Sequence, residues 1–337
     1  MSVKAIVIYL LAAAFVFSVF LRDPGINDYH RARFADMVYG KAHRPFVYRT
    51  LLPSTVRALT AAVPPGAREA LRGSLGETAF LGKVFSRFRW EKEHLTEYLV
   101  ACVLMYGSLL GFGLAVRYLF KGLYSRPPGW LADSLPALSV LLLLPFFSRA
   151  SYLYDFPALA LFTLGAALML RRRWKAYLVV FLLASINKET SILLTLIYAV
   201  HLYGVERHLR GFHLKMVSAQ IALFFAVKAA LYMAFRDNPG SLVEFHLIDH
   251  NIDLVDYSAT AVVSLALVAM TVSYRWKEKP LFLRDSLWIL PTLVLLTSLF
   301  GFLDELRDYY EAYPIVLLLV VDSISRMRGS ALDRAGR

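Results

Sequence analysis

Residues that could carry out chemistry on a substrate occur in a few short segments separated by long apolar runs. The segments contain Asp28-Tyr29, Tyr48-Arg49, Tyr154-Asp155, Asn187-Lys188-Glu189-Thr190 and the stretch 304–314. A carboxylate can act as a general base on an incoming hydroxyl group, and Arg or Lys can bind a phosphate. Ionisable residues at membrane depth are costly, so a convergent set indicates a functional site. We therefore predict a site that activates a hydroxyl group beside an anionic group.

The first of these segments supplies the candidate general base. Asp23, Asp28 and Asp36 all follow the first apolar run, although a single loop aspartate commonly serves as a helix cap or turn residue. Asp28 is distinguished by Tyr29 beside it and by the Tyr48-Arg49 element that follows. We predict that Asp28 is the catalytic base, with Asp23 and Asp36 as the alternatives.

Three basic residues, Arg49, Lys188 and Arg307, are candidates for binding a phosphate group. Arginine can hold a phosphate through a bidentate fork, whereas lysine acts as a point charge. The structural alternative for each is snorkelling or pairing with a nearby acid. For Arg307 this would be an ion pair within its own acidic loop. For Lys188 it would be an ion pair with Glu189, which we otherwise expect to orient Lys188 towards an anion.

Further residues are predicted to support this site. Tyr29 and Tyr48 flank the candidate base and Arg49. Tyr313 could stack on a sugar ring, although a belt of interfacial aromatic residues would explain it equally well. Asp155 precedes Pro157, a pattern typical of a helix cap followed by proline in the first turn.

The loop 236–256 holds the one pattern that could ligate a metal. Asp249, His250 and Asp253 are helically spaced there, with His246 nearby. Spacing in a loop does not supply the convergent geometry that metal ligands need. We assign no metal ligands and no certain cofactor, and a divalent cation, Mg²⁺ or Mn²⁺, stays open.

The elements that must position these residues are membrane helices. Hydrophobic residues make up 58% of the chain, too many for a soluble domain, and they lie in repeated apolar runs. We predict an all-α, polytopic transmembrane bundle that forms one integral membrane domain over residues 1–337. Its ten spans are expected at about 3–21, 96–119, 129–147, 153–170, 174–187, 190–204, 214–235, 257–274, 286–302 and 312–325.

The distribution of Lys and Arg orients these spans. If both termini are cytoplasmic, short loops such as those holding Lys121, Arg171-Arg172-Arg173 and Arg275 all lie inside. The net charge of +12 then reflects membrane topology rather than nucleic-acid binding. In this orientation every candidate segment faces outward from the cytoplasmic (inner) membrane.

The long outer loop 22–95 departs from a plain bundle. Its apolar stretches 46–63 and 79–90 are too short to span and carry interleaved Arg, a pattern typical of interfacial amphipathic helices. Pro64-Pro65-Gly66 should break the helix between them. We expect two or more helices on the outer surface, covering a cavity between the spans.

The segment 174–204 is split by the polar residues 187–190. Each half is shorter than the roughly 20 residues that a full crossing needs, so the junction should lie below the outer surface, inside a cavity. The helix that starts near Thr190 directs the positive end of its dipole at this junction, which favours an anion there.

In their order and common sidedness these motifs resemble those of the membrane-embedded GT-C glycosyltransferases. The matching residues are Asp28 in the first outer loop, Tyr48-Arg49 with Pro53, and Lys188-Glu189-Thr190 in mid-chain. An acidic and aromatic outer loop before the last span completes the resemblance. It implies a GT-C-like fold, Asp28 as base, a polyprenyl-phosphate sugar as donor and an inverting transfer. The first loop has no paired Asp-x-Asp, which puts metal dependence in doubt.

We therefore predict a glycosyltransferase of cell-envelope glycan biosynthesis. It would move a sugar from a polyprenyl-phosphate donor to a glycan, lipid or protein acceptor, with membrane lipids around it and no nucleic acid. The alternatives are a polysaccharide polymerase or ligase, and a transporter or flippase of a lipid-linked anionic substrate. A transporter should carry polar groups at mid-bilayer, whereas here they cluster outside.

Overall fold

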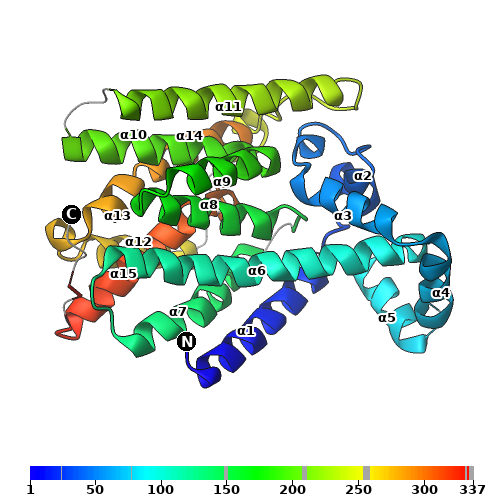
Figure 1. Cartoon of the computed structure of the whole chain (residues 1–337), viewed down its shortest axis with the longest axis horizontal. Coiled ribbons are helices and arrows are strands. Elements are labelled where there is room, and N and C mark those ends of the chain that lie inside the picture. Colours follow the sequence, from blue (N-terminus) through cyan, green and yellow to red (C-terminus); the bar gives the residue numbers. More distant parts are fainter. Residues whose placement is uncertain are drawn as a thin grey trace.

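The fold is all-helical, as predicted. The computed structural model describes residues 1–23, 25–76, 78–147, 151–206, 211–252, 259–330 and 332–333, and within them it contains helices and no β-strand. Figure 1 shows long helices packed side by side, with the shorter helices α2 to α5 gathered beyond one end of the bundle.

The helices follow the predicted segments closely. The first part of the chain forms α1 (Val3–Arg22), α2 (Phe34–Val38), α3 (Leu51–Ala62), α4 (Pro65–Gly76), α5 (Ala79–Phe88), α6 (Leu95–Leu123), α7 (Gly129–Leu141) and α8 (Asp155–Leu170). The second part forms α9 (Trp174–Asn187), α10 (Leu193–Glu206), α11 (Phe212–Ala234), α12 (Ala259–Ser273), α13 (Leu281–Ser286), α14 (Ile289–Phe300) and α15 (Tyr313–Met327). Every segment predicted as a span therefore coincides with a helix or with two consecutive helices.

Five helical segments are long and apolar enough to cross a membrane. They are Val3–Arg22, Lys92–Leu123, Gly129–Phe147, Phe212–Ala234 and Leu281–Phe300. Four other predicted spans are shorter apolar helices, and the last one corresponds to α15. Large apolar side chains such as Leu11, Phe225 and Met270 are exposed, as they are in helices that face lipid.

Local sequence explains where several helices begin. The Ser2 hydroxyl caps α1 by accepting a hydrogen bond from the amide of Ala5 at 3.3 Å. Pro65 and Pro314 lie in the first turns of α4 and α15, where the missing amide hydrogen costs no helical bond. The Pro64-Pro65 pair thus starts α4 as well as ending the element before it. The loop 22–95 forms several helices, as predicted.

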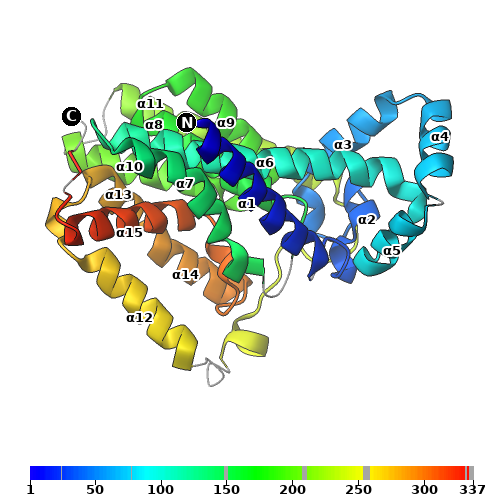
Figure 2. The same cartoon turned by 90° about the horizontal axis from the view of Figure 1, so that it is seen from below.

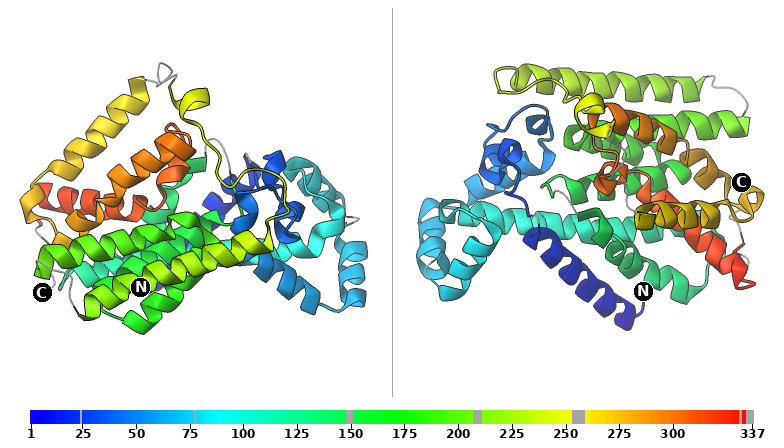
Figure 3. Two further views of the ribbon diagram at one scale, coloured as in Figure 1. Left: turned by 90° about the horizontal axis from the view of Figure 1, so that it is seen from above. Right: turned by 180° about the vertical axis from the view of Figure 1, so that it is seen from behind.

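The core is organised around α6, which packs along α8 and also contacts α1, α3 and α7. Gly113 permits the close approach of α1, because a Cβ atom there would lie 2.5 Å from the Tyr9 hydroxyl oxygen. Phe20 and Phe156 join α1 to α8 with ring centroids 4.3 Å apart. In contrast, α12 packs mainly against α15 and stands at the edge of the bundle (Figure 2 and Figure 3, left).

Candidate active site

The predicted motif segments meet at one end of the helical bundle. Helix α8 begins there, α9 ends there, and the turns that precede α10 and α15 lie beside them. We call this the motif end. The ionic residues that pair there form what we call the polar cluster: Arg49, Asp155, Lys188, Glu189, Lys228, Glu305, Arg307 and Glu311. The structure thus brings these motif segments to one end of the bundle, and the prediction that this end faces outward from the membrane stays a prediction.

Arg49 reaches the polar cluster from the turn that precedes α3. Its Nε atom donates to Glu189 at 3.1 Å, and its Nη1 atom donates to the Tyr154 hydroxyl group. The guanidinium carbon lies 4.5 Å from the centroid of the Tyr154 ring, a cation–π contact. Burial opposes the charge of this side chain, but Tyr154 and Glu189 raise the pKa of Arg49 above its ordinary value.

The guanidinium group of Arg307 lies over the ring of Tyr152, next to Tyr154. Its Nε atom donates to Glu305 at 2.9 Å, its Nη1 atom is 3.8 Å from Asp155, and its guanidinium carbon is 4.3 Å from the Tyr152 ring centroid. Burial opposes its charge as well, yet the Asp155 and Glu305 carboxylates raise the pKa of Arg307 well above its ordinary value. The predicted ion pair within the loop exists, and a second carboxylate from α8 joins it.

Two stacked tyrosines hold these two guanidinium groups near each other. The rings of Tyr152 and Tyr154 are 5.2 Å apart with an interplanar angle of 8°. Tyr152 and Tyr154 lie just before α8 rather than within a helix, and contacts with neighbouring segments fix their positions. The Tyr152 amide donates to Asp155, and Asn187 donates to the Tyr154 carbonyl at 3.0 Å. This pair was only partly visible in the sequence, since Tyr152 was not among the predicted residues.

Lys188 is buried and is paired differently from the prediction. Its Nζ atom lies 3.1 Å from Glu311, which also accepts a hydrogen bond from Thr190. Glu189 points elsewhere, to Arg49 and to Lys228 at 3.8 Å. The expectation that Glu189 holds Lys188 is therefore wrong. Adjacent residues at the end of a helix project in different directions, so Lys188 finds its partner on the turn before α15.

Lys228, Glu305 and Glu311 are the three cluster members that were not predicted from the sequence as site residues. Lys228 belongs to α11 and donates to the Ser185 carbonyl at 2.8 Å, so it points into the protein. The signal for Lys228 was a lone lysine inside an apolar run, which fitted snorkelling equally well. For Glu311 only its place in the acidic loop before α15 was informative.

Asp155 is not a helix cap, contrary to the prediction. It is the first residue of α8, while Tyr154 occupies the cap position. Its carboxylate accepts a hydrogen bond from the Tyr152 amide at 2.8 Å, and its other oxygen faces Arg307. Asp155 is completely buried, so its charge is balanced by Arg307 rather than by water.

Asp28 lies outside the polar cluster. Its carboxylate pairs with Arg89, and both side chains are exposed, to 43% and 71%. Tyr29 connects Asp28 to the cluster, because its ring packs on Phe46 at 5.2 Å and on Tyr152 at 6.3 Å. The structure thus brings together Arg49, Lys188 and Arg307 and places Asp28 at their border.

The remaining predicted residues occupy different positions. Asp23 is exposed just after α1, and Asp36 is half-buried in α2. The Tyr313 ring is buried and its hydroxyl donates to the Ser139 carbonyl at 2.6 Å, which ties α15 to α7. The Tyr313 ring therefore packs inside the bundle, whereas the sequence left sugar stacking and an interfacial belt as equal alternatives. Tyr48 is buried beside Arg49, and its hydroxyl has no hydrogen-bond partner among the described residues.

Three buried carboxylate oxygens of the polar cluster accept no hydrogen bond from the described residues. They are Asp155 Oδ1, Glu189 Oε1 and Glu311 Oε2. Buried polar atoms in folded proteins are almost always satisfied, and exceptions call for an explanation. Four carboxylates face four cations here, so charge is balanced while hydrogen bonding is not. The arrangement can accept hydrogen bonds from hydroxyl groups and can offer cations to an anion.

No metal centre is evident in the part of the chain that the structure describes, where no group of three or more His, Cys, Asp or Glu side chains could hold a metal ion. The predicted alternative at Asp249, His250 and Asp253 lies outside the described side chains. It stays a hypothesis from the sequence.

Comparison of the chain with protein-family models, curated proteins and solved structures finds no match. The candidate site consequently stands on its residues and geometry alone.

Proposed function

We propose that this protein is a membrane glycosyltransferase of GT-C type, which transfers a sugar from a polyprenyl-phosphate donor to an acceptor hydroxyl group. The observation that supports this most directly is the convergence of Arg49, Lys188 and Arg307 at one end of an apolar helical bundle. A donor with a lipid tail and a phosphate needs cations beside an apolar surface. In the proposed topology the protein is multi-pass in the cytoplasmic membrane and the motif end faces outward.

The three cations are proposed to bind the donor phosphate and stabilise it as it leaves. Each one now contacts a carboxylate, and an incoming phosphate would share or replace that contact. Arg49 and Arg307 are oriented by the stacked rings of Tyr154 and Tyr152, so their forks are held before substrate arrives. Preorganised charges of this kind lower the barrier because no reorganisation is needed during the reaction.

Asp28 is proposed as the base that accepts the proton of the acceptor. The acceptor oxygen would attack the anomeric carbon, the bond from that carbon to the phosphate oxygen would break, and the phosphate would leave with the electron pair. The proton would pass to the Asp28 carboxylate. Exposure at the border of the cluster suits a group that must meet an incoming acceptor, and Arg89 would have to yield part of its contact.

The test is sugar transfer by the purified protein in detergent from synthetic polyprenyl-phosphate sugars. Arg49→Ala and Lys188→Ala should each lower the rate about a hundredfold or more, as expected for groups that stabilise charge in the transition state. Asp28→Asn should lower it by a comparable factor through loss of the base. Arg57→Ala is the matched control, because Arg57 is an exposed arginine of α3 outside the cluster. It should keep wild-type rates.

Two results would overturn the proposal. Wild-type transfer by Lys188→Ala and Arg49→Ala would remove these cations from the site. Absence of transfer with every donor, together with substrate movement in sealed vesicles, would identify a transporter, since detergent leaves no second compartment.

A further inference from the structure

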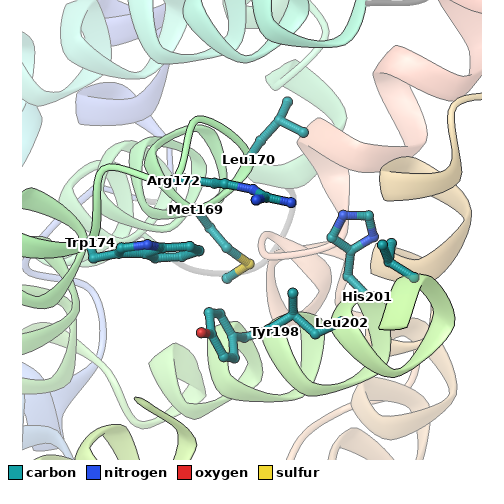
Figure 4. A pocket seen from close by; sticks show the side chains of 8 residues that line it. Met169, Leu170, Arg172, Trp174, Tyr198, His201 and Leu202 are labelled. Atoms are coloured by element: carbon teal, nitrogen blue, oxygen red, sulfur yellow. The ribbon is translucent and has the colours of Figure 1, made fainter. Parts of the chain in front are cut away.

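A small cavity lies at the opposite end of the bundle from the polar cluster. It has a volume of about 40 Å³ and is lined by the end of α8, the turn after it, the start of α9 and the second half of α10. Figure 4 shows the side chains around it, with Arg172 extending towards His201 and with Trp174 and Tyr198 on another side. None of these residues belongs to the proposed active site.

Arg172 is held in an unusual backbone conformation beside this cavity. Its φ angle is +55°, in the left-handed region that residues other than glycine seldom occupy. This conformation ends α8, because the Arg172 amide donates to the Met169 carbonyl and the Arg173 amide donates to the Leu168 carbonyl, each at 2.9 Å, the pattern of a left-handed helix cap. Among the described residues, no carboxylate or other group pairs with the exposed Arg172 guanidinium, whereas neighbouring Arg171 lies over the Tyr118 ring at 4.1 Å and donates to the Tyr118 carbonyl.

The other walls of the cavity are fixed by contacts of their own. The Trp174 ring meets the Tyr198 ring edge-on, with centroids 5.6 Å apart. His201 Nδ1 lies 2.7 Å from Asp285, and since a carboxylate only accepts, this nitrogen carries the proton. Within the described part of the chain, the cavity therefore has one cation without a paired side chain, a fixed histidine and two aromatic walls.

The size and chemistry of the cavity limit what it can bind. By the same measure, one water molecule needs roughly 10–15 Å³, so about 40 Å³ has room for a small group such as a phosphate. Basic pockets between helices at the cytoplasmic side bind phospholipid headgroups. The turn 171–173 and Lys175 make this end strongly basic, and exposed apolar residues such as Val179 and Val205 lie alongside.

We infer that this cavity binds the phosphodiester headgroup of an anionic phospholipid from the leaflet at this end of the bundle. Arg172 holds the phosphate, Trp174 and Tyr198 lie at the level of the headgroup, and the acyl chains run along the exposed faces of α9 and α10. This site is independent of sugar transfer, so the inference stands or falls separately from the proposed function.

The experiment is native mass spectrometry of the full-length protein in detergent, titrated with phosphatidylglycerol and, separately, with neutral phosphatidylcholine. Arg172→Gly removes the guanidinium and suits the left-handed backbone, so the variant should fold at least as well as wild type. It should bind phosphatidylglycerol about tenfold or more weakly, as expected for losing a charge-assisted contact. Arg173→Ala is the matched control from the same turn and should lose about threefold or less, because an outlying charge acts only through screened attraction.

Three outcomes would overturn the inference. Equal losses of phosphatidylglycerol affinity in Arg172→Gly and Arg173→Ala would mean that the overall charge of the turn, and not the cavity, attracts the lipid. Equal binding of phosphatidylcholine would remove the preference for an anionic headgroup. Displacement of phosphatidylglycerol by inorganic phosphate in large excess would identify a soluble anion as the ligand.

Discussion

The two ends of the bundle carry buried ionic networks of opposite character. At the end away from the motifs, Asp322 is fully buried and both of its oxygens are engaged, by Tyr124 at 2.9 Å and by Arg326 at 2.7 Å. Lys279 lies 3.6 Å from the same carboxylate and donates to Ser323 and to the Leu319 carbonyl. We call these residues the Asp322 network. Both carboxylate oxygens of Asp322 are hydrogen-bonded, whereas three carboxylate oxygens of the polar cluster accept no hydrogen bond from the described residues.

The difference indicates what each network is for. A buried ion pair whose hydrogen bonds are all made holds its elements together, and the Asp322 network joins α15 to α6 and to the turn before α13. In the polar cluster, Arg49, Lys188 and Arg307 converge from different segments and each contacts a carboxylate that an anion could replace. We therefore expect the Asp322 network to act in stability, and the polar cluster is the site at which we propose that substrate binds.

The largest effect is expected in a labelling experiment that tests which side of the membrane each end of the bundle faces. With Cys102, the only cysteine, replaced by Ser, a single Cys is placed at Gly73 of α4 or at Ser330 after α15. Both positions are exposed. An impermeant thiol reagent applied to intact cells should label the Cys at position 73 and spare the one at 330. The reverse pattern would invert the proposed topology.

A large loss of stability is expected when the Asp322 network is broken. Asp322→Asn keeps the shape of the side chain but leaves Lys279 and Arg326 without their buried counter-charge. It should destabilise the protein by about 3–5 kcal/mol in detergent. Glu278→Gln is the control, since Glu278 pairs with Arg326 at a half-exposed position, and should cost about 1 kcal/mol or less. Similar losses in both variants would contradict the special role of the Asp322 network.

A moderate effect is expected for coupling within the polar cluster. A double-mutant cycle between Lys188→Ala and Glu311→Ala should give an interaction energy of about 0.5–3 kcal/mol. The cycle is measured on the free energy of unfolding or on the activation free energy of sugar transfer. The cycle between Lys188→Ala and Glu189→Ala should give a smaller value, because these side chains do not pair. Stronger coupling in the second cycle would restore the pairing that the sequence favoured.

The smallest effect on stability is expected at Asp28. Arg89→Ala breaks the exposed Asp28–Arg89 pair and should change stability by about 1 kcal/mol or less. The same variant should keep transfer activity, whereas Asp28→Asn should lose it. Thermal unfolding measures the stability of both variants, and the transfer assay measures their activity. Loss of folding in Asp28→Asn would assign Asp28 a structural role instead.

Much of the fold was readable from local patterns. The apolar runs predicted the positions of the helices, since a membrane-spanning or buried helix needs an uninterrupted run of apolar residues. The split at residues 187–190 predicted the break between α9 and α10, and Lys188 is buried there as expected. The alternation of basic and polar loops predicted that the motif segments meet at one end.

The partners of individual side chains were not readable in the same way. Lys188 pairs with Glu311 rather than with its neighbour, and the Tyr313 hydroxyl donates to the Ser139 carbonyl. Lys228 points into the polar cluster, whereas the sequence left a snorkelling and a cavity-lining orientation equally open. Sequence alone determined which segments are helices and which ends of them meet, because hydrophobicity and charge act locally and cumulatively along the chain. Only the tertiary structure decided which carboxylate meets which cation, because that depends on how packed helices are rotated about their axes, and a salt bridge needs its nitrogen and oxygen atoms within about 4 Å.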